Sequence, residues 1–225
     1  MLIRLLPAVV TCAVIFIVAV LAGRYSAGLH SSFVPTSFVT HSVMLLLALV
    51  VMRTRLGLSP GDFGFTRGSF RWTPGIFLWV LPTALMSALS LAVPHGAEPS
   101  GPAASFSALQ IVLFVWIYAT VAEETLTRGL LQTLVARKRE SPTRHRWLGE
   151  PVIVSGVFFG AMHLVLIRSM GAAAVVPIVL ATFLGIVAAR YRQSTGSLLP
   201  AILVHALFNI GGTLPLWIVE WLRSG

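Results

Sequence analysis

The sequence predicts an all-α, polytopic transmembrane helix bundle, and three observations support this fold class. Of the 225 residues, 56% are hydrophobic and only 10% are charged, and the mean hydropathy is +0.89. Soluble domains contain about a quarter charged residues, so the composition argues against a soluble fold. The apolar residues also gather into long runs, most of them near the roughly 20 residues that a helix needs to cross a bilayer. Basic residues, finally, alternate with these runs.

The apolar runs define the expected elements, which number about seven within a range of roughly six to eight spans. Arg4 precedes the first run, but that run is long for the apolar part of a signal peptide, so we expect an uncleaved anchor. The connection at 57–72 mixes turn formers, aromatics and arginines, which indicates a segment in the headgroup region. We expect one structural domain, with N-terminal transmembrane helices and this interfacial segment in 1–106 and a catalytic helical core in 107–215. The runs cover residues 5–23, 34–52, 74–93, 107–136, 151–167, 172–190 and 197–218.

The positions of the basic residues predict the orientation of the chain in the membrane. The formal charge is +9, yet no basic patch interleaved with aromatics is present, which argues against a nucleic-acid partner. Twelve of the sixteen basic residues fall at the N-terminus or in the even-numbered loops, and the odd-numbered side has three. The positive-inside rule therefore predicts a cytoplasmic N-terminus, in an integral protein that we place in the cell membrane. The twelve are Arg4, Arg53, Arg55, Arg67, Arg71, Arg137, Lys138, Arg139, Arg144, Arg146, Arg190 and Arg192.

Two adjacent acids inside the fourth apolar run are the most informative polar feature. Glu123 and Glu124 are followed by Arg128, and ionisable groups at membrane depth are costly and usually functional. Residues four apart lie on one face of a helix, so Glu124 can pair with Arg128. Glu123 is rotated by about 100° from Glu124 and is free to face a cavity. The spacing therefore predicts a structural acid and a chemically available one.

Two further runs contain polar groups that we expect at the depth of Glu123. The fifth has Phe159 and His163, and the seventh has His205 and Asn209, again four residues apart. At 1.5 Å per residue, Glu123, His163 and Asn209 all lie roughly 18 to 20 Å from the helix ends that we assign. We therefore expect three helices to bring these groups together. His41 lies alone near the start of the second run, and we interpret it as an ordinary residue.

These residue types favour hydrolysis by a water molecule. A carboxylate and an imidazole converging on one water form a general-base pair. A second imidazole and an amide can donate hydrogen bonds to an oxyanion, each worth roughly 3 to 4 kcal/mol in other enzymes. No serine or cysteine is paired with a histidine in the sequence pattern, so a covalent nucleophile is unsupported. The sole cysteine, Cys12, also excludes an intramolecular disulfide.

The three motifs together resemble a known family. Glu-Glu-x-x-x-Arg, Phe-x-x-x-His and His-x-x-x-Asn, in this order on apolar helices, are similar to those of the CPBP (CAAX protease and bacteriocin-processing, or Abi) intramembrane endopeptidases, which include the type II CAAX prenyl endopeptidases. The resemblance covers about residues 107–215. It implies a substrate that is a membrane-associated protein or peptide, for example one with a prenylated CAAX end.

The resemblance also implies a role for each motif residue. Glu123 and His163 would activate the water, and His205 with Asn209 would form the oxyanion pocket. Arg128 would hold Glu124, and Phe159 would shape the site. No cofactor is expected; in a zinc alternative, Glu123, His163 and His205 would bind the metal with water as the fourth ligand.

Two other classes of function stay open at this point. The family resemblance also permits a non-catalytic membrane scaffold or bacteriocin-immunity protein. Buried acids and histidines can also relay protons in a proton-coupled transporter. Transporters often contain repeated halves, and no repeat is evident here. The endopeptidase hypothesis is therefore preferred.

Overall fold

The computed structural model describes residues 2–28, 34–55, 59–71, 73–92, 106–137 and 148–224. Every regular element within these ranges is helical and none is a strand, so the predicted all-α class is confirmed. Among the described residues, five helices are long and apolar enough to cross a membrane, and a shorter apolar helix spans Pro74–Leu89. The protein is therefore an integral membrane protein with a polytopic helix bundle. The basic residues Lys138, Arg139, Arg144 and Arg146 lie outside the described ranges.

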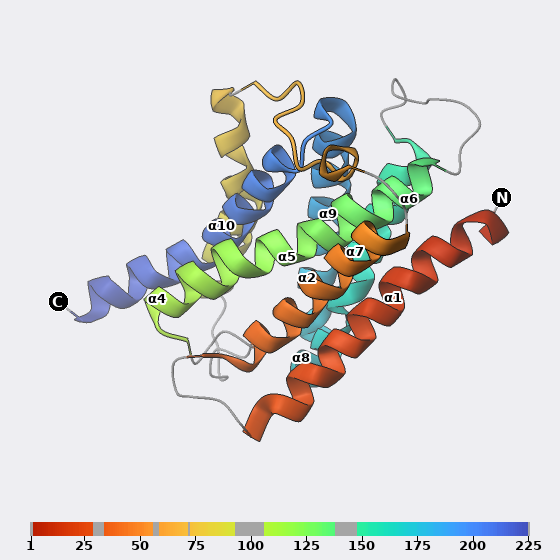
Figure 1. The fold of residues 1–225 in the computed structure, drawn as a ribbon. Coiled ribbons are helices and arrows are strands. Elements are labelled where there is room, and N and C mark those ends of the chain that lie inside the picture. Colours follow the sequence, from red (N-terminus) through yellow and green to blue (C-terminus); the bar gives the residue numbers. More distant parts are fainter. Residues whose placement is uncertain are drawn as a thin grey trace.

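The elements follow the predicted runs closely along the chain (Figure 1). Short helical turns at η1 (Ser26–Gly28), η2 (Pro60–Phe63), η6 (His163–Leu166), α8 (Ile167–Met170) and η7 (Gly171–Ala174) join the longer helices. A central helix is continuous from α4 (Ala108–Gln110) through η4 (Ile111–Ala119), α5 (Thr120–Glu124) and η5 (Thr125–Leu131) to α6 (Gln132–Arg137). The other long elements are α1 (Leu2–Tyr25), α2 (Thr36–Arg55), η3 (Pro74–Val80) with α3 (Leu81–Ala92), α7 (Glu150–Met162), α9 (Val175–Thr195) and α10 (Leu199–Ser224).

The central helix lies in the core of the bundle. All seven residues of its η5 segment are buried, including Arg128. The hairpin of α1 and α2 packs on one side of this helix, while α7, α9 and α10 contact it as well (Figure 1). The η5 part of this helix therefore presents its side chains to protein, so polar side chains on it can find partners.

The helices α7 and α9 form a tightly packed antiparallel pair within one helical stretch of 46 residues. The chain reverses near Gly171, whose φ of +56° lies in the left-handed region that favours glycine. Two glycines of α7 allow the close approach: a Cβ at Gly156 would lie 2.5 Å from Ile186, and one at Gly160 would lie 1.9 Å from Thr182. The two runs predicted at 151–167 and 172–190 are thus the arms of this hairpin.

The segment 59–71 is fastened to the turn between α9 and α10. The backbone N–H of Ser69 donates to the Thr195 carbonyl at 2.8 Å, and that of Leu198 donates to the Gly64 carbonyl at 2.9 Å. Gly64 has a φ of +92°, and a Cβ there would lie 2.5 Å from Nε of Arg192. The segment between α2 and η3 therefore closes one end of the bundle over the start of α10.

Charged groups hold the same end together. Arg192 donates from Nη2 to the Asp62 carbonyl at 2.9 Å. The hydroxyl and the backbone N–H of Ser59 donate to the Asp62 carboxylate at 2.8 and 2.9 Å, and these two bonds lower the pKa of Asp62 below its usual value. The second and sixth loops, which the basic-residue count assigns to one side, are therefore in contact.

Candidate active site

The two acids lie on a short α-helical segment between two π-helical ones. η4 ends at Ala119 and η5 begins at Thr125, so α5 contains both Glu123 and Glu124. The Thr120 hydroxyl donates to the Val115 carbonyl five residues earlier, at 3.3 Å, as the wider π turn allows. π-helical turns are rare and occur frequently at functional sites. The π-helical turns on both sides therefore indicate that α5 is part of a functional site.

Glu124 and Arg128 form a fully buried ion pair. Arg128 Nη1 donates to Glu124 Oε1 at 2.9 Å, and neither side chain has any exposed surface. The guanidinium also donates to the carbonyl of Gly185 on α9 at 3.0 Å and to the hydroxyl of Thr127. Its Cζ lies 4.5 Å above the ring centre of Phe159. The pair predicted from the spacing is thus present, and it joins the central helix to α7 and α9.

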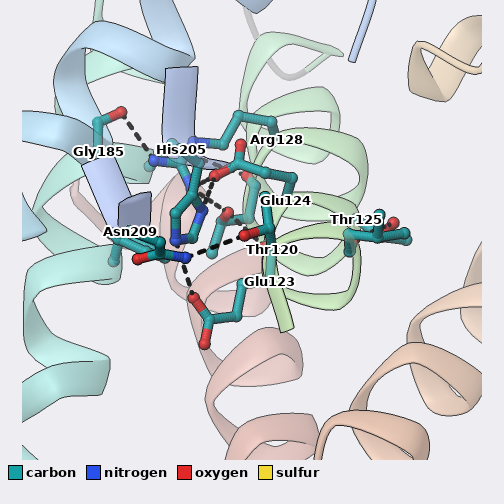
Figure 2. Close-up of polar contacts among 12 residues, drawn as sticks. Thr120, Glu123, Glu124, Thr125, Arg128, Gly185, His205 and Asn209 are labelled. Atoms are coloured by element: carbon teal, nitrogen blue, oxygen red, sulfur yellow. Dashed lines mark hydrogen bonds and ion pairs between the residues drawn. The ribbon is translucent and has the colours of Figure 1, made fainter. Parts of the chain in front are cut away.

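His205 connects the two acids (Figure 2). Its Nδ1 lies 2.8 Å from Glu124 Oε1, and its Nε2 lies 3.6 Å from Glu123 Oε2. Glu124 Oε1 already accepts from Nη1 of Arg128, so Nδ1 of His205 donates to the same oxygen. Any second proton on the ring is then on Nε2, which faces Glu123. Glu124 therefore sets the tautomer of His205, as carboxylates do for histidines elsewhere.

Glu123 is more open than Glu124, and its partner comes from α2. Its side chain is 16% exposed, and its Oε1 lies 3.0 Å from Nε2 of His41. The interpretation of His41 as a solitary, ordinary residue did not anticipate this contact. The two residues are 82 positions apart, and helical spacing reports only on contacts within one helix.

His163 and Phe159 pack beside this group. His163 Nδ1 lies 2.9 Å from the Phe159 carbonyl, to which it must donate, so a singly protonated ring has its lone pair on Nε2. The Phe159 ring lies 4.9 Å from the ring of His163 and meets that of His205 edge-on at 5.2 Å. Among the described residues, no hydrogen bond or ion pair joins His163 to Glu123. Phe159 thus contacts both imidazoles and the guanidinium.

Asn209 is bound to the central helix. Its amide nitrogen lies 3.1 Å from the Thr120 hydroxyl (Figure 2). The same nitrogen lies 3.2 Å from the Val115 carbonyl, so both amide hydrogens have acceptors. Four residues earlier on α10, His205 contacts the acids. The face shared by His205 and Asn209 is therefore directed at α5, as their spacing predicts.

The region that contains these motif residues is similar to a known protein family. Residues 104–211 match a family model described as type II CAAX prenyl endopeptidase Rce1-like. Residues 104–211, just under half of the chain, are called the Rce1-like domain because of this similarity. The resemblance to CAAX-type intramembrane proteases is thereby confirmed, and that family implies a membrane-associated protein as the substrate. No curated protein and no solved structure matches the chain.

The Rce1-like domain contains every site residue that the sequence motifs indicated, from Glu123 to Asn209. His41 lies outside it, in α2. Its only sequence signal is a titratable side chain in an apolar run, which by itself does not distinguish a site residue from one near a helix end. The contact between α2 and the central helix is needed to find it.

The residues of the zinc alternative are not gathered into a ligand set. In the part of the chain that is described, no group of three or more His, Cys, Asp or Glu side chains is placed to hold a metal ion. Glu123 and His205 approach each other, whereas His163 packs against Phe159. This arrangement therefore supplies no coordination geometry for a metal-dependent step. That the protein works without zinc stays a prediction, which metal analysis tests.

Proposed function

We propose that the protein is an intramembrane endopeptidase that hydrolyses a peptide bond of a membrane-associated protein with water activated by Glu123 and His163. The observation that carries this proposal is the asymmetry of the two acids within an Rce1-like domain: Glu124 is buried in fixed contacts, and Glu123 is partly exposed among imidazoles. A base must be reachable by water and substrate, and Glu123 meets this requirement.

The proposed reaction is hydrolysis without a covalent enzyme intermediate. Glu123 takes a proton from a water that also donates to the free Nε2 of His163. The water oxygen bonds to the scissile carbonyl carbon, and the C–N bond then breaks. The proton on Glu123 passes to the leaving nitrogen, so the carboxylate is restored and all atoms and charges balance.

The carbonyl oxygen gains negative charge during this attack. His205, when doubly protonated, would donate its Nε2–H to that oxygen while Nδ1 stays on Glu124. Asn209 would supply a second N–H by exchanging its bond to the Val115 carbonyl for one to the oxyanion. Both residues are on α10, so one helix would support the developing charge.

The test is cleavage by purified full-length protein in lipid vesicles. The probes are a quenched fluorescent peptide with a farnesylated CAAX end and the same peptide without the lipid. We expect Glu123→Gln and His163→Ala each to lower kcat by about 10²- to 10⁴-fold, the usual contribution of general acid–base groups. The exposed Arg24, changed to Gln, is the matched control and is expected to match wild type. Wild-type rates in both site variants would exclude the proposal and favour a scaffold or immunity role.

A prenylated substrate is the finer part of the proposal, and the two peptides decide it. Faster cleavage of the farnesylated peptide would support a CAAX-type substrate, since prenylation marks cysteines in such C-terminal boxes. Cleavage of both peptides at the same rate would exclude a requirement for the lipid. Comparing the termini of membrane proteins between wild-type and Glu123→Gln cells would then identify substrates directly.

The zinc alternative is separated by metal analysis of the purified protein and by a chelator. The proposal predicts no stoichiometric zinc and full activity after chelation. Bound zinc with loss of activity on chelation, and recovery when zinc is restored, would overturn the metal-free mechanism. It would leave the endopeptidase activity itself in place.

We further propose that the N-terminus and the even-numbered loops face the cytoplasm. The excess of basic residues on that side supports this orientation. In a Cys12→Ala background, Ser59→Cys would be the only thiol in the chain. A membrane-impermeant maleimide is expected to label it in inverted vesicles and to leave it unlabelled in intact cells; the opposite pattern would reverse the orientation.

A further inference from the structure

The α2 helix makes a specific contact with the central helix at the level of the acids. The ring of Phe38 lies 5.5 Å from that of Phe114, edge to face, and 4.9 Å from that of Tyr118. The Ser42 hydroxyl lies 2.8 Å from the Tyr118 hydroxyl. These contacts flank His41 in the sequence, so the position of its backbone relative to the central helix is determined by packing.

The His41 ring has one orientation that satisfies both of its nitrogens. Nδ1 lies 2.6 Å from the Ser37 carbonyl, and a carbonyl oxygen can only accept, so Nδ1 carries a proton. Nε2 then faces Glu123 Oε1 at 3.0 Å. Two acceptors cannot form a hydrogen bond with each other, so this contact contains one shared proton. Either an imidazolium donates to the carboxylate, or a protonated Glu123 donates to the ring.

The contact differentiates the two oxygens of Glu123. Oε1 is bound to His41, whereas Oε2 faces Nε2 of His205 at the longer distance of 3.6 Å. The charged and titratable groups around Glu123 are His41 on α2, His163 at the start of η6 and His205 on α10, together with Glu124 and Arg128 on its own helix. Oε2 is the oxygen that a water can approach without displacing the shorter contact.

We propose that His41 is a positioning residue that binds Oε1 of Glu123 and leaves Oε2 as the basic oxygen. This role rests on the proposed endopeptidase function, which it deepens. His41 acts through Glu123 and keeps its proton throughout the reaction. The site is consequently completed by α2, a helix outside the Rce1-like domain.

Kinetics with the farnesylated peptide test the role. His41→Ala should lower kcat by on the order of 10- to 100-fold, the effect of removing an orienting partner at other sites, with KM unchanged. His41→Gln should recover most of the rate because its amide nitrogen can reach Glu123 as Nε2 does. Ser42→Ala removes a neighbouring contact between the same two helices and should match wild type. If His41→Ala and Ser42→Ala have equal rates, or if only KM rises, the positioning role is overturned.

A spectroscopic measurement separates this inference from the proposed function. Histidine ¹⁵N signals of the full-length protein in detergent are recorded, and the His41 signals are those lost in His41→Gln. We expect a protonated Nδ1 in wild type and a changed Nε2 signal in Glu123→Gln, with Nδ1 retained. An unchanged Nε2 signal would overturn the His41–Glu123 contact. Absence of cleavage by wild type with a responsive Nε2 would instead overturn the proposed function and leave the contact standing.

Discussion

The surroundings of Glu123 and Glu124 differ sharply, although the two residues are adjacent. Glu124 is fully buried, and its Oε1 accepts from Arg128 and His205 at 2.9 and 2.8 Å. Glu123 is 16% exposed, and its partners are the imidazoles of His41 and His205. One acid thus has a guanidinium as a partner, and the partners of the other are imidazoles.

This difference separates structure from chemistry in one turn of helix. A buried carboxylate with an arginine partner is expensive to disrupt, since removing one partner leaves an uncompensated charge. A carboxylate among imidazoles can exchange protons without a change in packing. We therefore expect substitutions around Glu124 to act mainly on stability and substitutions of Glu123 mainly on catalysis.

The largest effect on stability is expected for Arg128→Met. It removes the ion pair, the bond to the Gly185 carbonyl and the contact with Phe159 while it leaves Glu124 buried. We expect the free energy of unfolding to fall by about 3 to 5 kcal/mol. Unfolding in mixed detergent micelles measures it, and Arg24→Met, at an exposed helix end, should stay within about 0.5 kcal/mol of wild type. A loss as small as that of the control would show that the pair around Glu124 is not structural.

A smaller effect is expected for Gly185→Ala, which acts on the same side of the site. An added Cβ would lie 2.8 Å from backbone atoms of Gly156, which cannot yield as a flexible side chain would. The strain of separating α7 from α9 should lower the free energy of unfolding by about 1 to 3 kcal/mol. Gly212→Ala is the matched control, since an added Cβ there meets nothing within 4 Å. Equal effects of the two variants would contradict the close packing at Gly185.

The double variant Glu124→Gln/Arg128→Met measures the coupling directly. Removing both charges leaves no isolated ion, so the double variant should be more stable than the sum of the single effects predicts. The expected interaction energy is about 0.5 to 3 kcal/mol, typical of residues in contact. The same cycle with Glu123→Gln and Arg128→Met should give a smaller value. Equal coupling for the two acids would remove the distinction between them.

The smallest effect on stability is expected for Glu123→Gln itself. The amide is similar in shape to the carboxylate and can still bond to His41, so the free energy of unfolding should change by less than about 1 kcal/mol, near the average for point substitutions. The same micelle unfolding measures it. A loss as large as that of Arg128→Met would mean that Glu123 is also structural, and the fall in kcat could then reflect unfolding.

Much of the site could be predicted because its parts are local. The four-residue spacings place Glu124 with Arg128, and His205 with Asn209, on single helix faces, and helix geometry requires nothing else. The spacing argument also separated Glu123 from Glu124 by rotation. It could not reveal that His205 bridges both acids, because that contact depends on how α10 crosses the central helix.

The treatment of His41 shows the limit of this reasoning. In the sequence it is a solitary histidine near the start of an apolar run, whereas in the structure it contacts Glu123. The contact exists because Phe38 and Ser42 pack on Phe114 and Tyr118, and these side chains carry no motif. Packing between distant helices follows from shape complementarity across many residues, which a pattern within one run does not encode.

By itself the sequence determined the helical, membrane-spanning class, the elements and the residues of the three motifs. Hydrophobic run length and helical periodicity are properties of the local chain, so they can be predicted without a fold. Only the tertiary structure decided the partners of each acid, the close approach of α7 and α9 at their glycines and the place of α2 beside Glu123. These contacts depend on which helix faces pack against each other, and the packing of the whole bundle determines that.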